Sequence, residues 1–66
     1  MEIHVNGERR TVPDGITVLS LLRGFSLPET RVAVERNSSL VRKSEFESTL
    51  LAEGDRIEIV TFVGGG

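Results

Sequence analysis

The sequence contains no cysteine, and only two of its 66 residues are proline. Without cysteine the chain can form neither a disulfide nor a thiolate metal site, and any sulfur or acyl chemistry cannot use a side-chain thiol of this protein. A domain of this length buries only about 60% of its unfolded surface on folding. Its stability is therefore expected to be marginal and to rest on a small hydrophobic core.

An excess of positive charge is also absent. Eight lysines and arginines stand against ten aspartates and glutamates, a formal net charge of −2. Nucleic-acid binders usually carry a basic face, so we expect no nucleic-acid partner. No apolar run approaches the roughly 20 residues of a membrane span, and the N-terminal residues lack the basic and apolar regions of a signal peptide. We expect a cytoplasmic, single-domain protein without membrane contact that is monomeric when free.

The first dozen residues predict a β-hairpin. Residues 2–6 alternate polar and apolar, which places Ile3 and Val5 on the inner face of a strand. Asn6-Gly7 is the strongest two-residue hairpin signal, because a type I′ turn needs positive φ at both central positions. Residues 8–12 then return as a second strand, and Pro13-Asp14-Gly15 ends the hairpin.

A short helix is predicted next, with Thr17 as its N-cap. Ile16 and Leu21 fit the two positions of a hydrophobic staple around that cap. One apolar face recurs at helical spacing, formed by Val18, Leu21, Leu22 and Phe25. Gly24 costs roughly 1 kcal/mol inside a helix, so we expect the helix to end there after two to three turns. Phe25 and Leu27 are expected to pack on the same core.

The second half of the chain predicts three more strands. Residues 32–36 are apolar enough for the middle of a sheet, and a turn at residues 37–39 leads to a short strand at residues 40–41. Ser44 is expected to cap a single helical turn. Residues 56–62 form the most regular strand, with Ile57 and Ile59 inward and three residues on the other face: Glu58, Val60 and Phe62.

This order of elements indicates an α+β fold, in which one main helix packs on one face of a mixed sheet of four to five strands. The first and last strands are expected to be parallel neighbours at the centre, because the intervening helix supplies the crossover that such a pair requires. We expect a folded domain at residues 1–62 and a flexible C-terminal glycine arm at residues 63–66, since three terminal glycines offer nothing to pack.

Three segments carry a resemblance to a known family. They are Val34-Glu35-Arg36-Asn37, residues 51–60 with their Glu53-Gly54-Asp55 turn, and the end of the chain, Phe62-Val63-Gly64-Gly65-Gly66. With the order of elements and the length, they make the chain similar to the ThiS family, the sulfur carriers of thiamine biosynthesis. The resemblance implies a ubiquitin-like β-grasp fold.

The resemblance also implies a chemistry. An adenylating enzyme (ThiF-like) would use ATP to convert the Gly66 carboxylate to an acyl-adenylate. A persulfide sulfur that originates from cysteine, for example through a cysteine desulfurase, would then displace AMP and leave a thiocarboxylate. A thiazole synthase (ThiG-like) would take up that sulfur. On this interpretation the chain is not an enzyme, holds no bound cofactor or metal and supplies no catalytic side chain.

The physical chemistry of the arm fits this interpretation. An α-carboxyl group titrates at about 3.3–3.7 and is ionised at neutral pH. Four extended residues give a reach of about 13 Å, at about 3.3–3.6 Å per residue. Any side chain at Gly65 should crowd a narrow channel around the arm, whereas Gly64 is expected to be a spacer.

Partner recognition is expected to lie beside the arm. Exposed apolar clusters often mark partner sites, and the strand pattern places one here, made of Val60, Phe62 and Val63. Polar contacts at its rim are expected from Glu35, Arg36 and Glu58. His4, the only histidine, falls on the outer side of the first strand and is expected to be an ordinary surface residue.

Three alternative functions remain open at this point. The chain could carry sulfur for another pathway, such as molybdopterin formation, tRNA thiolation or cysteine synthesis. It could be a ubiquitin-like modifier that is joined to lysines of other proteins. It could also be a β-grasp interaction module that undergoes no reaction, although that leaves the glycine arm unexplained.

Overall fold

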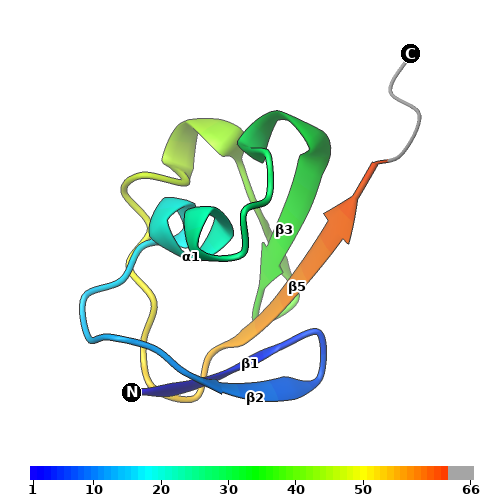
Figure 1. Ribbon diagram of the computed structural model, residues 1–66. Coiled ribbons are helices and arrows are strands. Elements are labelled where there is room, and N and C mark those ends of the chain that lie inside the picture. The colour runs from blue at the N-terminus through cyan, green and yellow to red at the C-terminus, as the bar shows by residue number, and fades with distance from the viewer. Residues whose placement is uncertain (63–66) are drawn as a thin grey trace.

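The computed structural model describes residues 1–62, and residues 63–66 lie outside the described part of the chain. Its elements are the strands β1 (Glu2–Val5), β2 (Glu8–Thr11), β3 (Val32–Arg36), β4 (Ser39–Val41) and β5 (Arg56–Thr61), the helix α1 (Val18–Gly24), and two 3₁₀ turns, η1 (Glu29–Arg31) and η2 (Lys43–Glu45). The strands form one five-stranded sheet in the order β2-β1-β5-β3-β4, and α1 lies against one of its faces (Figure 1). The predicted α+β architecture is confirmed.

Two tight turns of the same kind connect neighbouring strands. Asn6 and Gly7 join β1 to β2 with φ of 50° and 82°, and Val5 pairs with Glu8 across this turn. Asn37 and Ser38 join β3 to β4 with φ of 51° and 72°. Positive φ at both central positions twists a turn in the sense that a hairpin needs. The predicted Asn6-Gly7 hairpin is therefore confirmed.

The first and last strands are parallel neighbours, as predicted. Val5 of β1 pairs with Ile57 of β5, and β5 also pairs antiparallel with β3, so that β5 occupies the centre of the sheet. In Figure 1, β5 runs through the sheet between β1 and β3. In the sequence, Phe62 and then the glycine-rich residues 63–66 follow this central strand.

The helix begins and ends where the sequence predicts. The hydroxyl oxygen of Thr17 accepts a hydrogen bond from the backbone N–H of Ser20 at 3.1 Å, and α1 ends at Gly24 after seven residues. The predicted cap at Ser44 is wrong. The backbone N–H of Glu45 donates to the carbonyl of Arg42 at 2.8 Å, so η2 starts before Ser44 and takes no side-chain cap.

The core lies between α1 and the inner face of the sheet. Its buried residues come from every strand except β2: Ile3, Val5, Val32, Val34, Val41, Ile57 and Ile59, with Val18, Leu21 and Leu22 from α1, and Phe46 and Leu51 from the connections. Phe25 and Leu27 are partly buried against them, as predicted. Each fully buried aliphatic side chain contributes about 1.5–3 kcal/mol, which makes this cluster the main stabilising element of the domain.

Candidate functional site

The opposite face of the sheet, here called the outer face, carries the predicted partner-binding residues. Side chains alternate along β5, and Ile57 and Ile59 are buried under α1 whereas Glu58 and Val60 are exposed on the other side. In residues 1–62, α1 lies on the inner side of the sheet and no element is drawn across the outer face (Figure 1). The outer face is therefore open to a partner.

Large apolar side chains are exposed at the end of the outer face that adjoins the arm. Val60 is 56% exposed and Phe62 is 55% exposed. Ala33 of β3 pairs with Val60 and is half-buried. The backbone N–H of Phe62 donates to the carbonyl of Arg31 at 2.8 Å, which keeps the chain extended beyond the last residue of β5. This hydrogen bond holds Phe62 beside Val60 at the start of the arm.

Two carboxylates stand opposite each other in the middle of the outer face. Glu35 of β3 pairs directly with Glu58 of β5, and both are exposed. Within residues 1–62 neither side chain takes part in an ion pair. Like charges directly opposite each other in a sheet are destabilising. The pair therefore gives the outer face a local negative charge at some expense of stability.

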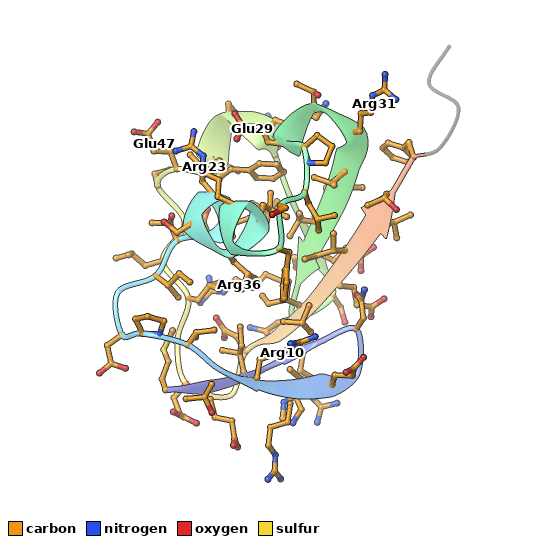
Figure 2. All side chains as sticks on the ribbon, in the orientation of Figure 1. Arg10, Arg23, Glu29, Arg31, Arg36 and Glu47 are labelled. Atoms are coloured by element: carbon orange, nitrogen blue, oxygen red, sulfur yellow. The ribbon has the colours of Figure 1, made fainter. Side chains whose placement is uncertain are left out.

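The expected position of Arg36 at the rim of this surface has to be corrected. Arg36 pairs with Ile57, so its side chain leaves the sheet on the inner side, as Figure 2 shows. There its Nε donates to Oδ2 of Asp55 at 2.8 Å. Glu35 and Arg36 are adjacent in sequence, and a strand sends adjacent residues to opposite faces. Only Glu35 lies on the outer face with Glu58.

Asp55 is the one buried charged residue among those described, and it is satisfied on both oxygens. The amide of Asn37 donates to Oδ1 at 3.1 Å, and the backbone N–H of Ala52 donates to Oδ2 at 2.8 Å, beside Arg36. Burial raises the pKa of Asp55, but the hydrogen bonds from Ala52, Asn37 and Arg36 together outweigh it, so that its pKa lies below the usual value. The network fixes the turn from which β5 starts.

Leu40, Arg9 and Arg56 were not predicted as part of the outer face, whereas the position of His4 on that face was. Leu40 of β4 is 68% exposed and lies next to Glu35. The sequence signal for this exposed leucine is the adjacent pair Leu40-Val41. Adjacent side chains of a strand point to opposite faces, so only one of the two can be buried on the inner face. Arg9, His4 and Arg56 form a row across β2, β1 and β5. His4 is half-buried, and its Nδ1 is buried without a hydrogen-bond partner among the described atoms.

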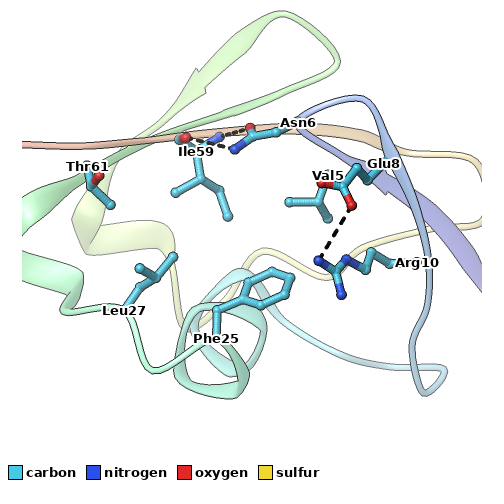
Figure 3. A pocket seen from close by; sticks show the side chains of 8 residues that line it. All are labelled: Val5, Asn6, Glu8, Arg10, Phe25, Leu27, Ile59 and Thr61. Carbon is cyan, nitrogen blue, oxygen red and sulfur yellow. Dashed lines mark hydrogen bonds and ion pairs between the residues drawn. The ribbon is translucent and has the colours of Figure 1, made fainter.

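A hollow of about 330 Å³ opens on the inner side, between the end of α1 and the first hairpin (Figure 3). It is lined by Val5, Asn6, Glu8, Arg10, Phe25, Leu27, Ile59 and Thr61. Its longer polar side chains are engaged within the domain. The amide of Asn6 bonds the backbone of Ile59 twice, and Arg10 lies 4.0 Å from Glu8 and stacks over Phe25. The hollow is therefore a weaker candidate than the outer face.

Four of the predicted site residues, Val63, Gly64, Gly65 and Gly66, lie outside the described residues. Among residues 1–62, no group of three or more His, Cys, Asp or Glu side chains is placed to hold a metal ion. In the same part of the chain, no helix has the length and apolar character needed to cross a membrane.

Within residues 1–62, the sheet order and the one α-helix packed against the sheet define a class, the ubiquitin-like β-grasp proteins. Its likeness to a solved structure supports this: the crystal structure of the thiamine biosynthesis protein ThiS from Geobacter metallireducens superposes with a TM-score of 0.84 at 32% identity, over 100% of both chains. A model of the ThiS family matches residues 3–66. The chain belongs to the ThiS family.

Relatives of two lengths match the chain. The sulfur carrier protein ThiS of Bacillus subtilis is 42% identical over 50 residues, which cover 76% of each protein. A thiazole synthase of Magnetococcus marinus is 42% identical over 66 residues, and one of Paramagnetospirillum magneticum is 41% identical over the same length. The chain covers 20% of the length of each thiazole synthase. In those two proteins a domain like this one is part of a longer chain.

Proposed function

We propose that this protein is the sulfur carrier for thiazole formation in thiamine biosynthesis. The observation that carries the proposal is the course of β5, which passes from the centre of the sheet, beside the exposed Val60 and Phe62, directly into the glycine arm. The name of the Bacillus subtilis relative supports the same function. Because β5 is paired with a strand on each side, it holds the start of the arm in a fixed position. The apolar surface beside the arm offers a partner a place to bind.

The chemistry proceeds on the Gly66 carboxylate. A carboxylate oxygen attacks the α-phosphorus of ATP, pyrophosphate leaves, and an acyl-adenylate forms. A persulfide sulfur then attacks the acyl carbon and displaces AMP, and cleavage of the sulfur–sulfur bond by a reducing thiol leaves a thiocarboxylate on Gly66. Transfer of that sulfur to the thiazole precursor returns a carboxylate. The carboxyl group, with a usual pKa of about 3.3–3.7, is ionised and nucleophilic at neutral pH.

The chain acts in this scheme as a co-substrate of other enzymes. Gly65 and Gly64 give the arm a backbone without side chains, which a narrow channel can accept. The outer face supplies recognition through Val60 and Phe62, with Val63 next in sequence. Acid–base groups, metal and nucleotide-binding groups belong to the partners, and ATP is bound by the adenylating enzyme.

Three partners follow from this role: an adenylating enzyme of the ThiF type, a thiazole synthase of the ThiG type, and a sulfur donor such as a cysteine desulfurase. The Magnetococcus and Paramagnetospirillum relatives support the thiazole synthase as a partner. Both proteins are named thiazole synthase, and each contains a domain similar to this chain within a longer polypeptide. We place the reaction in the cytoplasm.

The test is to incubate the protein with a cognate adenylating enzyme, ATP and a sulfur donor and to measure its intact mass. Replacement of one oxygen by sulfur supports the carrier function. Adducts on other proteins would instead indicate a modifier, and an unchanged mass would contradict both. A requirement for the thiazole precursor after loss of the gene distinguishes thiamine biosynthesis from the other sulfur-transfer pathways.

A further inference from the structure

The side chain of Asn6 continues the parallel pairing of β1 with β5 beyond the last residue of β1. The backbone N–H of Asn6 donates to the carbonyl of Ile57 at 2.8 Å. At the next position along β5 the partner is the side-chain amide of Asn6. Its Oδ1 accepts from the N–H of Ile59 at 2.7 Å, and its Nδ2 donates to the carbonyl of Ile59 at 3.1 Å (Figure 3). A side-chain amide has the donor and the acceptor of a peptide group, so Asn6 takes the place of a further strand residue.

The residue after Asn6 is Gly7, and this dipeptide is chemically labile. The backbone nitrogen that follows an asparagine can attack the carbonyl carbon of the asparagine side chain, and glycine has no side chain to hinder the approach. The chain has one other asparagine, Asn37, and Ser38 follows it. Asn37 also makes two side-chain hydrogen bonds, at 3.1 and 2.9 Å. Asn6 is therefore the more reactive of the two asparagines once its side chain is free.

We propose that Asn6 is a site of spontaneous deamidation, that opening of its contact with β5 controls the rate, and that the product cannot rebuild this contact. Hydroxide removes the proton of the Gly7 nitrogen, which bonds to Cγ of Asn6. The bond from Cγ to Nδ2 breaks, and the amide nitrogen takes a proton from water and leaves as ammonia. Water then opens the cyclic imide to aspartate or isoaspartate at position 6. The reaction needs no enzyme and does not depend on the proposed function.

The contacts of Asn6 oppose this reaction in the folded chain. Both polar atoms of its amide are bonded to Ile59, so Cγ cannot turn toward the nitrogen of Gly7 until both hydrogen bonds break. The pairing of Val5 with Glu8 holds the two ends of the turn together. Groups that are protected in this way react through opened conformations, as backbone amides do in hydrogen exchange. The rate of deamidation therefore measures how often Asn6 separates from β5.

Either product damages the same junction. In aspartate an oxygen replaces Nδ2 and faces the carbonyl oxygen of Ile59, where the wild type has a hydrogen bond of 3.1 Å. An ionised carboxylate only accepts hydrogen bonds, so two acceptors repel each other at this position. Isoaspartate adds a carbon atom to the backbone of the turn and disturbs the pairing of Val5 with Glu8. A modified chain therefore separates from β5 more readily than an unmodified one.

The first test compares deamidation in the folded chain with deamidation in guanidinium chloride, at one temperature and one mildly alkaline pH. Peptide mapping by mass spectrometry measures the replacement of the amide NH₂ by OH at each asparagine. We expect Asn6 to react faster in the unfolded chain by at least about tenfold, and faster there than Asn37. Equal rates in the folded and unfolded chains would overturn the proposed protection. An unmodified Asn6 in the unfolded chain would overturn the site.

The variant Asp14→Asn separates the contact with Ile59 from folding in general. Asp14 is 90% exposed and precedes Gly15, so the substitution creates a second asparagine–glycine pair in the same folded chain. Under native conditions we expect position 14 to deamidate at least about tenfold faster than Asn6. Equal rates at the two positions would show that the contact with Ile59 does not control the reaction, and would overturn the proposal.

The variant Asn6→Asp tests the consequence of the modification. It has the shape of the wild-type side chain without the donor, and it should unfold at a lower concentration of guanidinium chloride. The control Thr30→Asp adds the same charge at an exposed residue of η1, outside the sheet, and should leave the midpoint unchanged. If Asn6→Asp is as stable as the wild type, the product rebuilds its contact with β5 and the proposal is overturned.

Discussion

Arg36 and Asp55, 19 residues apart in sequence, meet through a hydrogen bond of 2.8 Å between Nε and Oδ2. Arg36 is the last residue of β3, and Asp55 immediately precedes β5. With Asn37 and the backbone of Ala52, this contact joins the β3–β4 turn to the Glu53-Gly54 turn. This partly buried ion pair therefore ties the end of β3 to the start of the central strand.

Asp55 should make stability sensitive to acid. Its folded pKa is below its usual value, which is also the value expected for the unfolded chain, about 3.9. A carboxyl of this kind contributes stability that is fully present above the unfolded pKa and is lost as pH falls through the folded pKa. We expect Asp55→Asn to be less stable than the wild type by about 1–3 kcal/mol at pH 7, with the difference shrinking below about pH 4.

Urea unfolding of both proteins between neutral pH and about pH 2.5 checks this prediction. Glu47, which is exposed and forms no ion pair among residues 1–62, provides the control Glu47→Gln, which should leave the acid dependence close to that of the wild type. Parallel stability curves for the wild type and Asp55→Asn would show that Asp55 is not the group responsible.

Asn6 should be more important for stability than its place in a surface turn suggests. Its Oδ1 accepts from the N–H of Ile59 at 2.7 Å, and its Nδ2 donates to the carbonyl of Ile59 at 3.1 Å. Asn6→Ala removes both hydrogen bonds and a residue that tolerates φ of 50°. We expect a loss of about 1–3 kcal/mol in unfolding free energy, against about 0.5 kcal/mol or less for Thr11→Ala on the edge strand. Equal losses would refute the special role of Asn6.

Two leucines of opposite exposure separate core packing from surface effects. Leu22, on the buried side of α1, is 0% exposed, whereas Leu40 of β4 is 68% exposed. Leu22→Ala should lower the unfolding free energy by about 2–5 kcal/mol, because it leaves a cavity in the core. Leu40→Ala, the same chemical change, should cost about 0.5 kcal/mol or less. Chemical denaturation measures both, and similar costs would contradict the assigned core.

Phe62 should matter for binding and not for folding. It is 55% exposed, and its backbone N–H, which the substitution keeps, donates to the carbonyl of Arg31. Phe62→Ala should leave the unfolding free energy within about 0.5 kcal/mol of the wild type. It should weaken binding to the adenylating enzyme by about tenfold or more, as expected for an aromatic anchor. Calorimetric titration measures the affinity, and an unchanged dissociation constant would remove Phe62 from the interface.

Substitution in the glycine arm should impair adenylation more at Gly65 than at Gly64. We expect Gly65→Ala, or deletion of Gly66, to abolish adenylation and to leave the melting temperature unchanged, because glycine has no side chain to bury in a core. Gly64→Ala, one position earlier, is the matched control and should retain activity. ATP–pyrophosphate exchange is the measurement. Retained exchange in Gly65→Ala would contradict the assigned role of the arm.

Local signals in the sequence were sufficient for most of the elements. The Asn6-Gly7 turn, the Thr17 cap and the end of α1 at Gly24 depend on residues within a few positions of each other, and the structure confirms all three. Ser44 shows the limit of such signals. The η2 turn is formed by the backbone hydrogen bond from Glu45 to Arg42, and it has no side-chain cap. Alternation along residues 56–62 also predicted Val60 as an outward residue of β5, and both Val60 and Phe62 are exposed.

The sequence by itself determined the fold class and the position of the glycine arm after the last strand, because turn chemistry, helix capping and strand alternation act over short distances along the chain. Only the tertiary structure decided which distant residues share a face. Strand register paired Glu35 with Glu58 on the outer face and sent Arg36 to Asp55 on the inner one. A shift of one residue reverses the face of every side chain in a strand, so the pattern of charge beside the arm is a property of the assembled sheet.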